Sequence, residues 1–217
     1  MLVHTHRTTR ATRAKLCLLL LAIALSGACA SKTKGQQQVQ GFAKTRDLLA
    51  GAQVQVDATL GALNGLLRTP MEHLDEAFTA YKKEVGKLKK EGEDAKWRAQ
   101  TMKEQRDLQI STWQKEMESI TDADIKASLK SRQDAVRANY ALIRMYADDA
   151  RKAYDPFLKG NQQMVKALAI DLSPAALNSL GPSIARVTAD GVTLKGKLSA
   201  MQHAMDNTAG GFSPIGL

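Results

Sequence analysis

Few side chains of this 217-residue chain are of the types that perform catalysis. Only two of its four histidines, His73 and His203, lie beyond the N-terminal segment, and they are far apart in sequence. His73 precedes Glu76 by three residues, whereas the di-iron motif of helical bundles places glutamate before histidine and repeats the motif. A nucleophile activated by histidine would also need a nearby partner. We therefore expect no catalytic residue, no metal site and no cofactor.

Cys29 is the residue whose surroundings indicate a definite reaction. Residues 1–28 contain four basic and no acidic side chains, and an apolar run over residues 16–25 leads into the small residues 26–28. This order is typical of a secretory signal. Because the small residues lead directly into a cysteine, the segment resembles a bacterial lipoprotein signal, in which the thiol accepts diacylglycerol. We expect residues 1–28 to be removed as a signal peptide and Cys29 to become the lipidated N-terminus, with palmitate among its acyl chains.

The same segment leaves a second cleavage site open. The leucine usually found three places before the cysteine is replaced by Ser26. Ala28, Cys29 and Ala30 also fit the small-x-small site of ordinary signal peptidase, which would release a soluble chain starting at Ser31. Ala30 at the second position resembles the signal for outer-membrane sorting in Gram-negative bacteria. The two predictions are an outer-membrane lipoprotein that faces the periplasm and, as the alternative, a freely secreted periplasmic binding module.

Removal of the leader changes the charge of the chain. The full sequence has 31 basic and 22 acidic side chains and a net charge of +9. Four basic residues leave with the leader, so 27 remain against 22 acidic residues and the net charge falls to +5. The basicity is largely that of an export signal, and we expect no nucleic acid as a partner. Since Cys17 also leaves, Cys29 has no partner for an internal disulfide.

A basic cluster lies well inside the mature chain, and a tryptophan follows it. Basic side chains could contact anionic lipid or polysaccharide, but interleaved acidic residues also fit a solvated helix face. Trp97 lies off the predicted apolar stripe and Trp113 lies on it, so Trp97 is the better candidate for contact with a partner. The possible interaction surface, named here the lysine–Trp97 surface, consists of Trp97, Lys82, Lys83, Lys87, Lys89 and Lys90.

Four segments have the spacing of helices. Apolar residues recur every three or four positions along residues 42–67, 71–120, 121–168 and 173–206. Thr69-Pro70 should end the first segment, whereas Asp155-Pro156 leaves the apolar stripe of the third in phase and predicts a kink. Ser173-Pro174 suits the N-cap and first residue of the last helix. No segment alternates as a strand does, so we expect an all-α fold.

Short connections make consecutive helices antiparallel neighbours. Because the two central segments are the longest, we expect an elongated antiparallel coiled coil, in which a four-helix bundle tapers to a two-helix hairpin tip over residues 107–138. The expected organisation is a lipidated N-terminus and flexible tether (29–41), a helical coiled-coil domain (42–206) and a disordered tail (207–217). The same pairing places Gly92 and Gly191 on either side of Tyr154.

Three short motifs are similar to those of a known family. WQKE at residues 113–116 precedes the hairpin turn, AYDPFL occupies residues 153–158, and DLSPAAL occupies residues 171–177. Together with the leader, they resemble the proteobacterial lipoproteins grouped as domain of unknown function 2959, over roughly residues 30–206. The resemblance implies an envelope location and a coiled-coil shape, and no activity that could be carried over. We expect a non-catalytic structural or adaptor lipoprotein with an unidentified protein partner in the envelope.

Overall fold

The computed structural model describes the backbone of residues 34–212 and the side chains of residues 44–207. All of its regular structure is helical, and no strand occurs within residues 34–212, so the all-α prediction is confirmed. The elements are α2 (Lys34–Arg68), the short 3-10 helix η1 (Met71–His73), α3 (Leu74–Glu118), α4 (Ala123–Ile170), α5 (Pro174–Ser179) and α6 (Gly181–Phe212).

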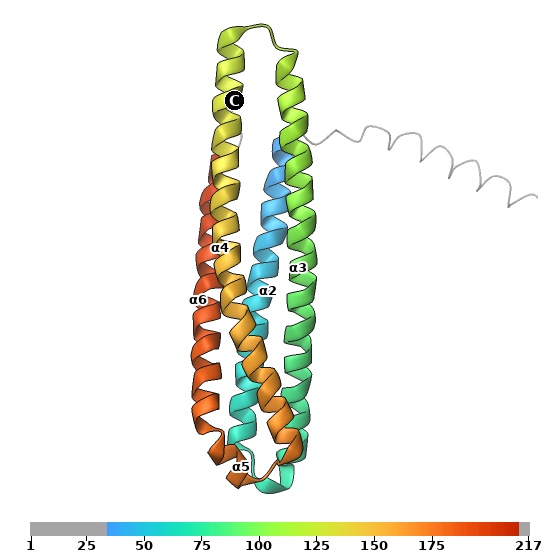
Figure 1. Ribbon diagram of the computed structural model, residues 1–217, viewed down its shortest axis with the longest axis vertical. Helices are drawn as coiled ribbons and strands as arrows, with labels where there is room; N and C mark the ends of the chain where they lie inside the picture. Colours follow the sequence, from blue (N-terminus) through green and yellow to red (C-terminus); the bar gives the residue numbers. More distant parts are fainter. Residues whose placement is uncertain (1–33, 213–217) are drawn as a thin grey trace, which may run out of the picture.

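The four long helices form an elongated bundle (Figure 1). Neighbours around the bundle are α2 and α3, α3 and α4, α4 and α6, and α6 and α2. At one end the chain turns through η1 and α5, and at the other end α3 and α4 extend beyond α2 and α6 as a two-helix hairpin. The predicted taper from four helices to two is therefore confirmed.

Local signals set most helix ends where the sequence predicts them. α2 ends at Arg68, directly before Thr69-Pro70. Asp122 caps α4 by accepting a hydrogen bond from the backbone N–H of Ile125, and Ser173 caps α5 in the same way from Ala176. α4 continues through Pro156, and Figure 1 shows it changing direction between its yellow and orange parts. A proline inside a helix removes one backbone hydrogen bond, which accounts for the kink.

Three boundaries differ from the predictions. α2 begins at Lys34, so residues 34–41 of the predicted tether are helical, because glutamine has good helix propensity and no proline interrupts the segment. α6 continues to Phe212, so residues 207–212 of the predicted disordered tail are helical. Pro214 follows two residues later in the sequence, and a proline disfavours the helical conformation of the residue before it. Residues 29–33 and 213–217 lie outside the described part of the chain. The last predicted helix is also divided at Leu180, just before Pro182, into α5 and α6.

The core follows the predicted apolar stripes. Along α2, however, the step of four residues from Leu63 predicts that Leu67 is buried, whereas Leu67 is 37% exposed and its neighbour Leu66 is fully buried. The other buried apolar residues on the predicted stripes are Leu49, Val56, Leu63, Leu74, Tyr81, Val85, Leu88, Met117, Val136, Ile143, Ala150, Phe157, Met164, Leu168, Val187, Leu194, Leu198 and Met205.

The register between α3 and α4 is close to the predicted one. Tyr154 donates a hydrogen bond to the backbone carbonyl of Leu88 at 3.1 Å, and a Cβ atom added to Gly92 would overlap the Tyr154 ring. The predicted contact of Gly191 with Tyr154 is wrong. A Cβ atom at Gly191 would meet Leu60 and Phe157, each at 2.9 Å. The separate helix α5 shifts α6 along the bundle, which a simple turn near residue 172 does not anticipate.

Candidate functional site

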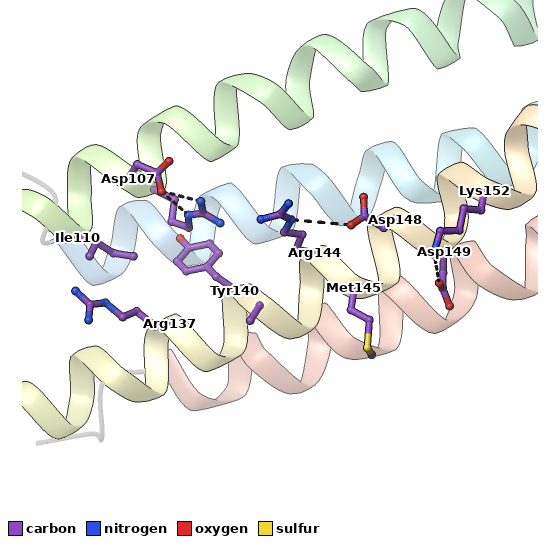
Figure 2. A pocket seen from close by; sticks show the side chains of 11 residues that line it. Asp107, Ile110, Arg137, Tyr140, Arg144, Met145, Asp148, Asp149 and Lys152 are labelled. Atoms are coloured by element: carbon purple, nitrogen blue, oxygen red, sulfur yellow. Dashed lines mark hydrogen bonds and ion pairs between the residues drawn. The ribbon is translucent and has the colours of Figure 1, made fainter.

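An open groove of about 670 Å³ lies between α3 and α4 (Figure 2). Its volume is in the range of small-ligand pockets, which bury ligands against apolar and polar groups. Four basic and three acidic residues contribute to it, together with apolar side chains. The lining residues are Arg106, Asp107, Ile110, Arg137, Tyr140, Ala141, Arg144, Met145, Asp148, Asp149 and Lys152.

Arg106 is the basic residue that α3 contributes to the lining of this groove. The apolar stripe of α3 alternates steps of four and three residues, but two steps of four follow each other around Arg106. A guanidinium group therefore occupies a stripe position that other turns fill with an apolar side chain. Only 19% of its side chain is exposed. The guanidinium donates two hydrogen bonds, of 3.0 and 2.7 Å, to one oxygen of Asp107. Asp107 is 56% exposed, so this ion pair is close to solvent.

Two arginines of α4 flank Tyr140 at helical spacing and therefore lie on the same face of the helix. Arg144 is 3.9 Å from Asp148, and Arg137 is 3.8 Å from Asp134. These distances are longer than a hydrogen bond, although each guanidinium carries five N–H donors. Arg137 also donates a hydrogen bond to Oε1 of Gln114 at 3.4 Å. Because the ion pairs of both arginines are long, their remaining N–H groups can donate to an added oxyanion.

At one end of the groove, an ion pair links α4 to the neighbouring helix α6. Asp149 lies 3.1 Å from Lys197 of α6 and 4.0 Å from Lys152 of its own helix. One carboxylate thus faces two ammonium groups, and Figure 2 shows Asp149 and Lys152 together at this end. Because all three side chains are partly exposed, the network adds little to stability.

Tyr140 contributes the phenol of the groove. Burial raises the pKa of Tyr140 above its usual value, and the positive charge of Arg106 lowers it by a smaller amount. The phenol therefore stays protonated at neutral pH, where its hydroxyl can donate and accept hydrogen bonds.

The chemistry that this groove supports is binding. Guanidinium groups form strong charge-assisted hydrogen bonds with carboxylates and phosphates, and the side chains of Ile110 and Met145 add apolar surface. None of the lining residues is a histidine, cysteine or serine. The groove can thus hold an anionic group through noncovalent contacts.

The lysine–Trp97 surface lies elsewhere on α3. All five lysines are exposed, and 69% of Trp97 is exposed. Lys87 forms a 2.7 Å ion pair with Glu84, and this hydrogen bond, followed by one from Gln55, lowers the pKa of Glu84. Nine residues separate Trp97 from Arg106, which corresponds to two and a half turns, so the two residues lie on opposite sides of the helix. The structure therefore does not bring this surface and the groove together.

The two histidines are also separate. His73 lies in η1, where its ring is 3.9 Å from Glu76 and both side chains are mostly exposed. His203 lines a smaller hollow of about 310 Å³ between α4 and α6, beside Tyr146. Among the residues that the structure describes, no three potential metal ligands lie close enough to hold an ion.

Cys29, the predicted lipidation site, lies outside the described residues. Within the described helices, none has a stretch that is long and apolar enough to cross a bilayer. The groove itself was not predicted from the sequence. Its one sequence signal is Arg106, a charged residue at the point where the α3 stripe slips.

The fold and the groove define a class: an elongated, antiparallel helical bundle with a charged, open groove between its two longest helices. The chain belongs to the family described as "Protein of unknown function (DUF2959)", whose sequence profile matches residues 30–211. No curated protein and no solved structure showed significant similarity to the chain. The resemblance noted from the three motifs is therefore confirmed at the level of the family.

Proposed function

We propose that this protein is a lipoprotein of the bacterial cell envelope, anchored in the outer membrane through Cys29 and facing the periplasm. The observation that carries the proposal is the position of Cys29, directly after small residues at the end of an export signal. Lipidation of this thiol would attach the whole rod to a membrane surface. The mature protein has no catalytic role in this proposal and acts as a structural or adaptor element.

The shape of the bundle supports an adaptor role. α3 has 45 residues and is therefore about 68 Å long, at 1.5 Å per residue. A rod of this length presents separate surfaces along its sides, and the lysine–Trp97 surface and the α3–α4 groove lie on different ones. An exposed tryptophan beside charged groups is typical of residues that anchor protein interfaces. We assign the lysine–Trp97 surface to an envelope protein partner.

A second candidate function follows from Ala30, the small residue directly after Cys29. Cleavage after Ala30 would release a soluble periplasmic binding module that begins at Ser31. Its docking surface would be the same lysine–Trp97 surface, since this part of the chain does not depend on the anchor.

Mass analysis of the mature N-terminus separates these candidates. The lipoprotein proposal requires an acylated Cys29 and partitioning into the detergent phase, with loss of both in a Cys29→Ser variant. Cys17→Ser is the matched control, because Cys17 lies in the leader and its replacement should leave both properties unchanged. A free Ser31 terminus would overturn the lipoprotein proposal and support the secreted module.

A further inference from the structure

The position of the anchor along the rod determines which end faces the membrane. α2 begins on the side of the α3–α4 hairpin and runs toward the end formed by η1 and α5 (Figure 1). The chain therefore enters the bundle from the hairpin side. This direction of entry follows from the path of the backbone and does not depend on the side chains of the hairpin.

Two contacts give the level of Lys34 relative to the end of α3. Thr45 donates to the sulfur of Met102 at 3.6 Å, and Gln55 donates to the backbone carbonyl of Glu84 at 3.1 Å. Counting residues along both helices from these contacts, at about 1.5 Å per residue, places Glu118 about 8 to 20 Å beyond Lys34 along the rod.

The segment between Cys29 and α2 is too short for the opposite end of the rod to reach the membrane. Cys29 precedes Lys34 by five residues, which span at most about 18 Å even when fully extended. A membrane holding Cys29 must therefore pass within that distance of Lys34. The opposite end of α2, at Arg68, is 34 residues and about 51 Å away. An upright rod thus cannot stand with its η1–α5 end on the membrane.

The turn between α3 and α4 has side chains suited to a headgroup layer. Ile125 is 53% exposed, and Ile120 beside it is partly exposed. The surrounding charges are mainly acidic, with four carboxylates against two lysines: Glu116, Glu118, Asp122 and Asp124 against Lys115 and Lys126. Such a surface fits a zwitterionic bilayer better than an anionic one.

We propose that the α3–α4 hairpin tip rests against the headgroups of the membrane that holds Cys29, so that the protein stands with its η1–α5 end projecting away. This inference rests on the lipid anchor of the proposed function. It assigns the tip to a zwitterionic lipid surface and places the four-helix end at the far side, where it can meet other envelope components.

Energy transfer from a single dye to the membrane tests this orientation. Because Cys29 is acylated, Thr121→Cys at the tip or Asn178→Cys at the opposite end supplies the one thiol for labelling, and both positions are exposed. The full lipidated protein is reconstituted into phosphatidylcholine vesicles that contain a headgroup-labelled acceptor lipid. We expect a donor at residue 121 to lose most of its emission and a donor at residue 178 to lose almost none of its emission.

Flotation with the vesicles separates failure of the anchor from failure of the orientation. A protein that does not float overturns the proposed lipid anchor. A protein that floats but loses equal donor emission at both positions lies flat on the membrane. One that loses more emission at residue 178 has its η1–α5 end at the membrane, and one that loses none at either position has neither end there. Each of these results overturns the inference. Ile125→Asp, or phosphatidylglycerol added to the vesicles, should reduce transfer at residue 121 while flotation stays unchanged. Unchanged transfer would contradict the assigned tip contact.

Discussion

The hydroxyl group of Tyr81 donates a hydrogen bond to Oδ1 of Asn161 at 2.8 Å, and both side chains are fully buried. Tyr81 lies on α3 and Asn161 on α4, at positions of the apolar stripes that face each other across the bundle. The amide nitrogen of Asn161 donates in turn to the backbone carbonyl of Phe157 at 2.8 Å. This polar contact satisfies both groups in one register only, so it disfavours sliding of α3 along α4.

We expect the Tyr81–Asn161 pair to show strong coupling. Tyr81→Phe leaves Oδ1 of Asn161 buried without its donor, which should cost about 1 to 3 kcal/mol in the free energy of unfolding. Asn161→Leu should do the same to the tyrosine hydroxyl. The double variant removes both polar partners and should cost less than the sum of the single changes, as measured by urea unfolding. Simple additivity would show that the hydrogen bond does not couple the helices.

Gly92 provides a prediction about packing. A Cβ atom there would overlap the hydroxyl end of Tyr154 and lie 2.8 Å from its Cε1 atom. Gly92→Ala should therefore displace Tyr154 from its hydrogen bond to Leu88, at a cost of about 1 to 3 kcal/mol, offset by about 1 kcal/mol of helix propensity. Urea unfolding midpoints measure the net effect.

The matched control for this variant is Gly86→Ala on the same helix. Apart from its chain neighbours and the backbone of its own helix, no atom lies within 4 Å of the added Cβ, so only the gain in helix propensity, up to about 1 kcal/mol, should remain. In a Tyr154→Ala background, Gly92→Ala should also become stabilising, because the overlap is gone. A destabilising effect in that background would rule out Tyr154 as the cause.

The stability of the bundle should fall at alkaline pH. Burial, with smaller contributions from nearby carboxylates, raises the pKa of Tyr154 to about 12, against about 10 in the unfolded chain. Between these values the unfolded state loses its proton first, so stability is full below pH 10 and falls as pH rises, by at most about 1.4 kcal/mol per pH unit for this residue. Burial raises the pKa of Tyr81 in the same direction. Urea unfolding across this range should show a shallower fall for Tyr154→Phe; an equal fall would contradict the assignment.

Arg106 should influence the titration of Tyr140. Its positive charge lowers the pKa of the phenol, in opposition to the larger effect of burial. Arg106→Met should therefore raise the pKa of Tyr140 further, as followed by the absorbance of the phenolate with Tyr140→Phe as the reference. Arg132→Met, which removes an exposed cation from α4, should leave the titration of Tyr140 unchanged. An equal shift in both variants would point to a general charge effect.

The two tryptophans should separate folding from association. Trp97 is 69% exposed, so Trp97→Ala should change the free energy of unfolding by no more than about 0.5 kcal/mol. Trp113 packs against the core while partly exposed, and Trp113→Ala should cost more, though less than the about 3 to 5 kcal/mol of a fully buried aromatic residue. Thermal unfolding and acrylamide quenching of each single-tryptophan variant measure both properties. A large loss of stability in Trp97→Ala would assign Trp97 to the fold and remove it from the interaction surface.

Much of the fold could be predicted because its determinants are local. Apolar spacing identifies the helix faces, while Thr69-Pro70, Asp122 and Ser173 mark helix ends by their own backbone and capping preferences. Where a short turn joins two long helices, residue numbers alone also predict cross-helix neighbours. The contact between Gly92 and Tyr154 was predicted in this way.

Other features depend on how the helices meet in three dimensions. Gly191 faces Leu60 and Phe157 because α5 shifts α6 along the bundle, and the length of a short helix within a turn is decided by packing against several partners. The groove likewise requires charged side chains from two helices whose separation is not encoded in either one. By itself the sequence predicts an export signal with Cys29 as the candidate anchor, and it determines the four helical stripes. The short connection at Thr69-Pro70 also implies that α2 enters the bundle on the hairpin side. Only the tertiary structure decides the level of α6 along the bundle and the groove between α3 and α4, since both depend on how the packed helices are arranged in space.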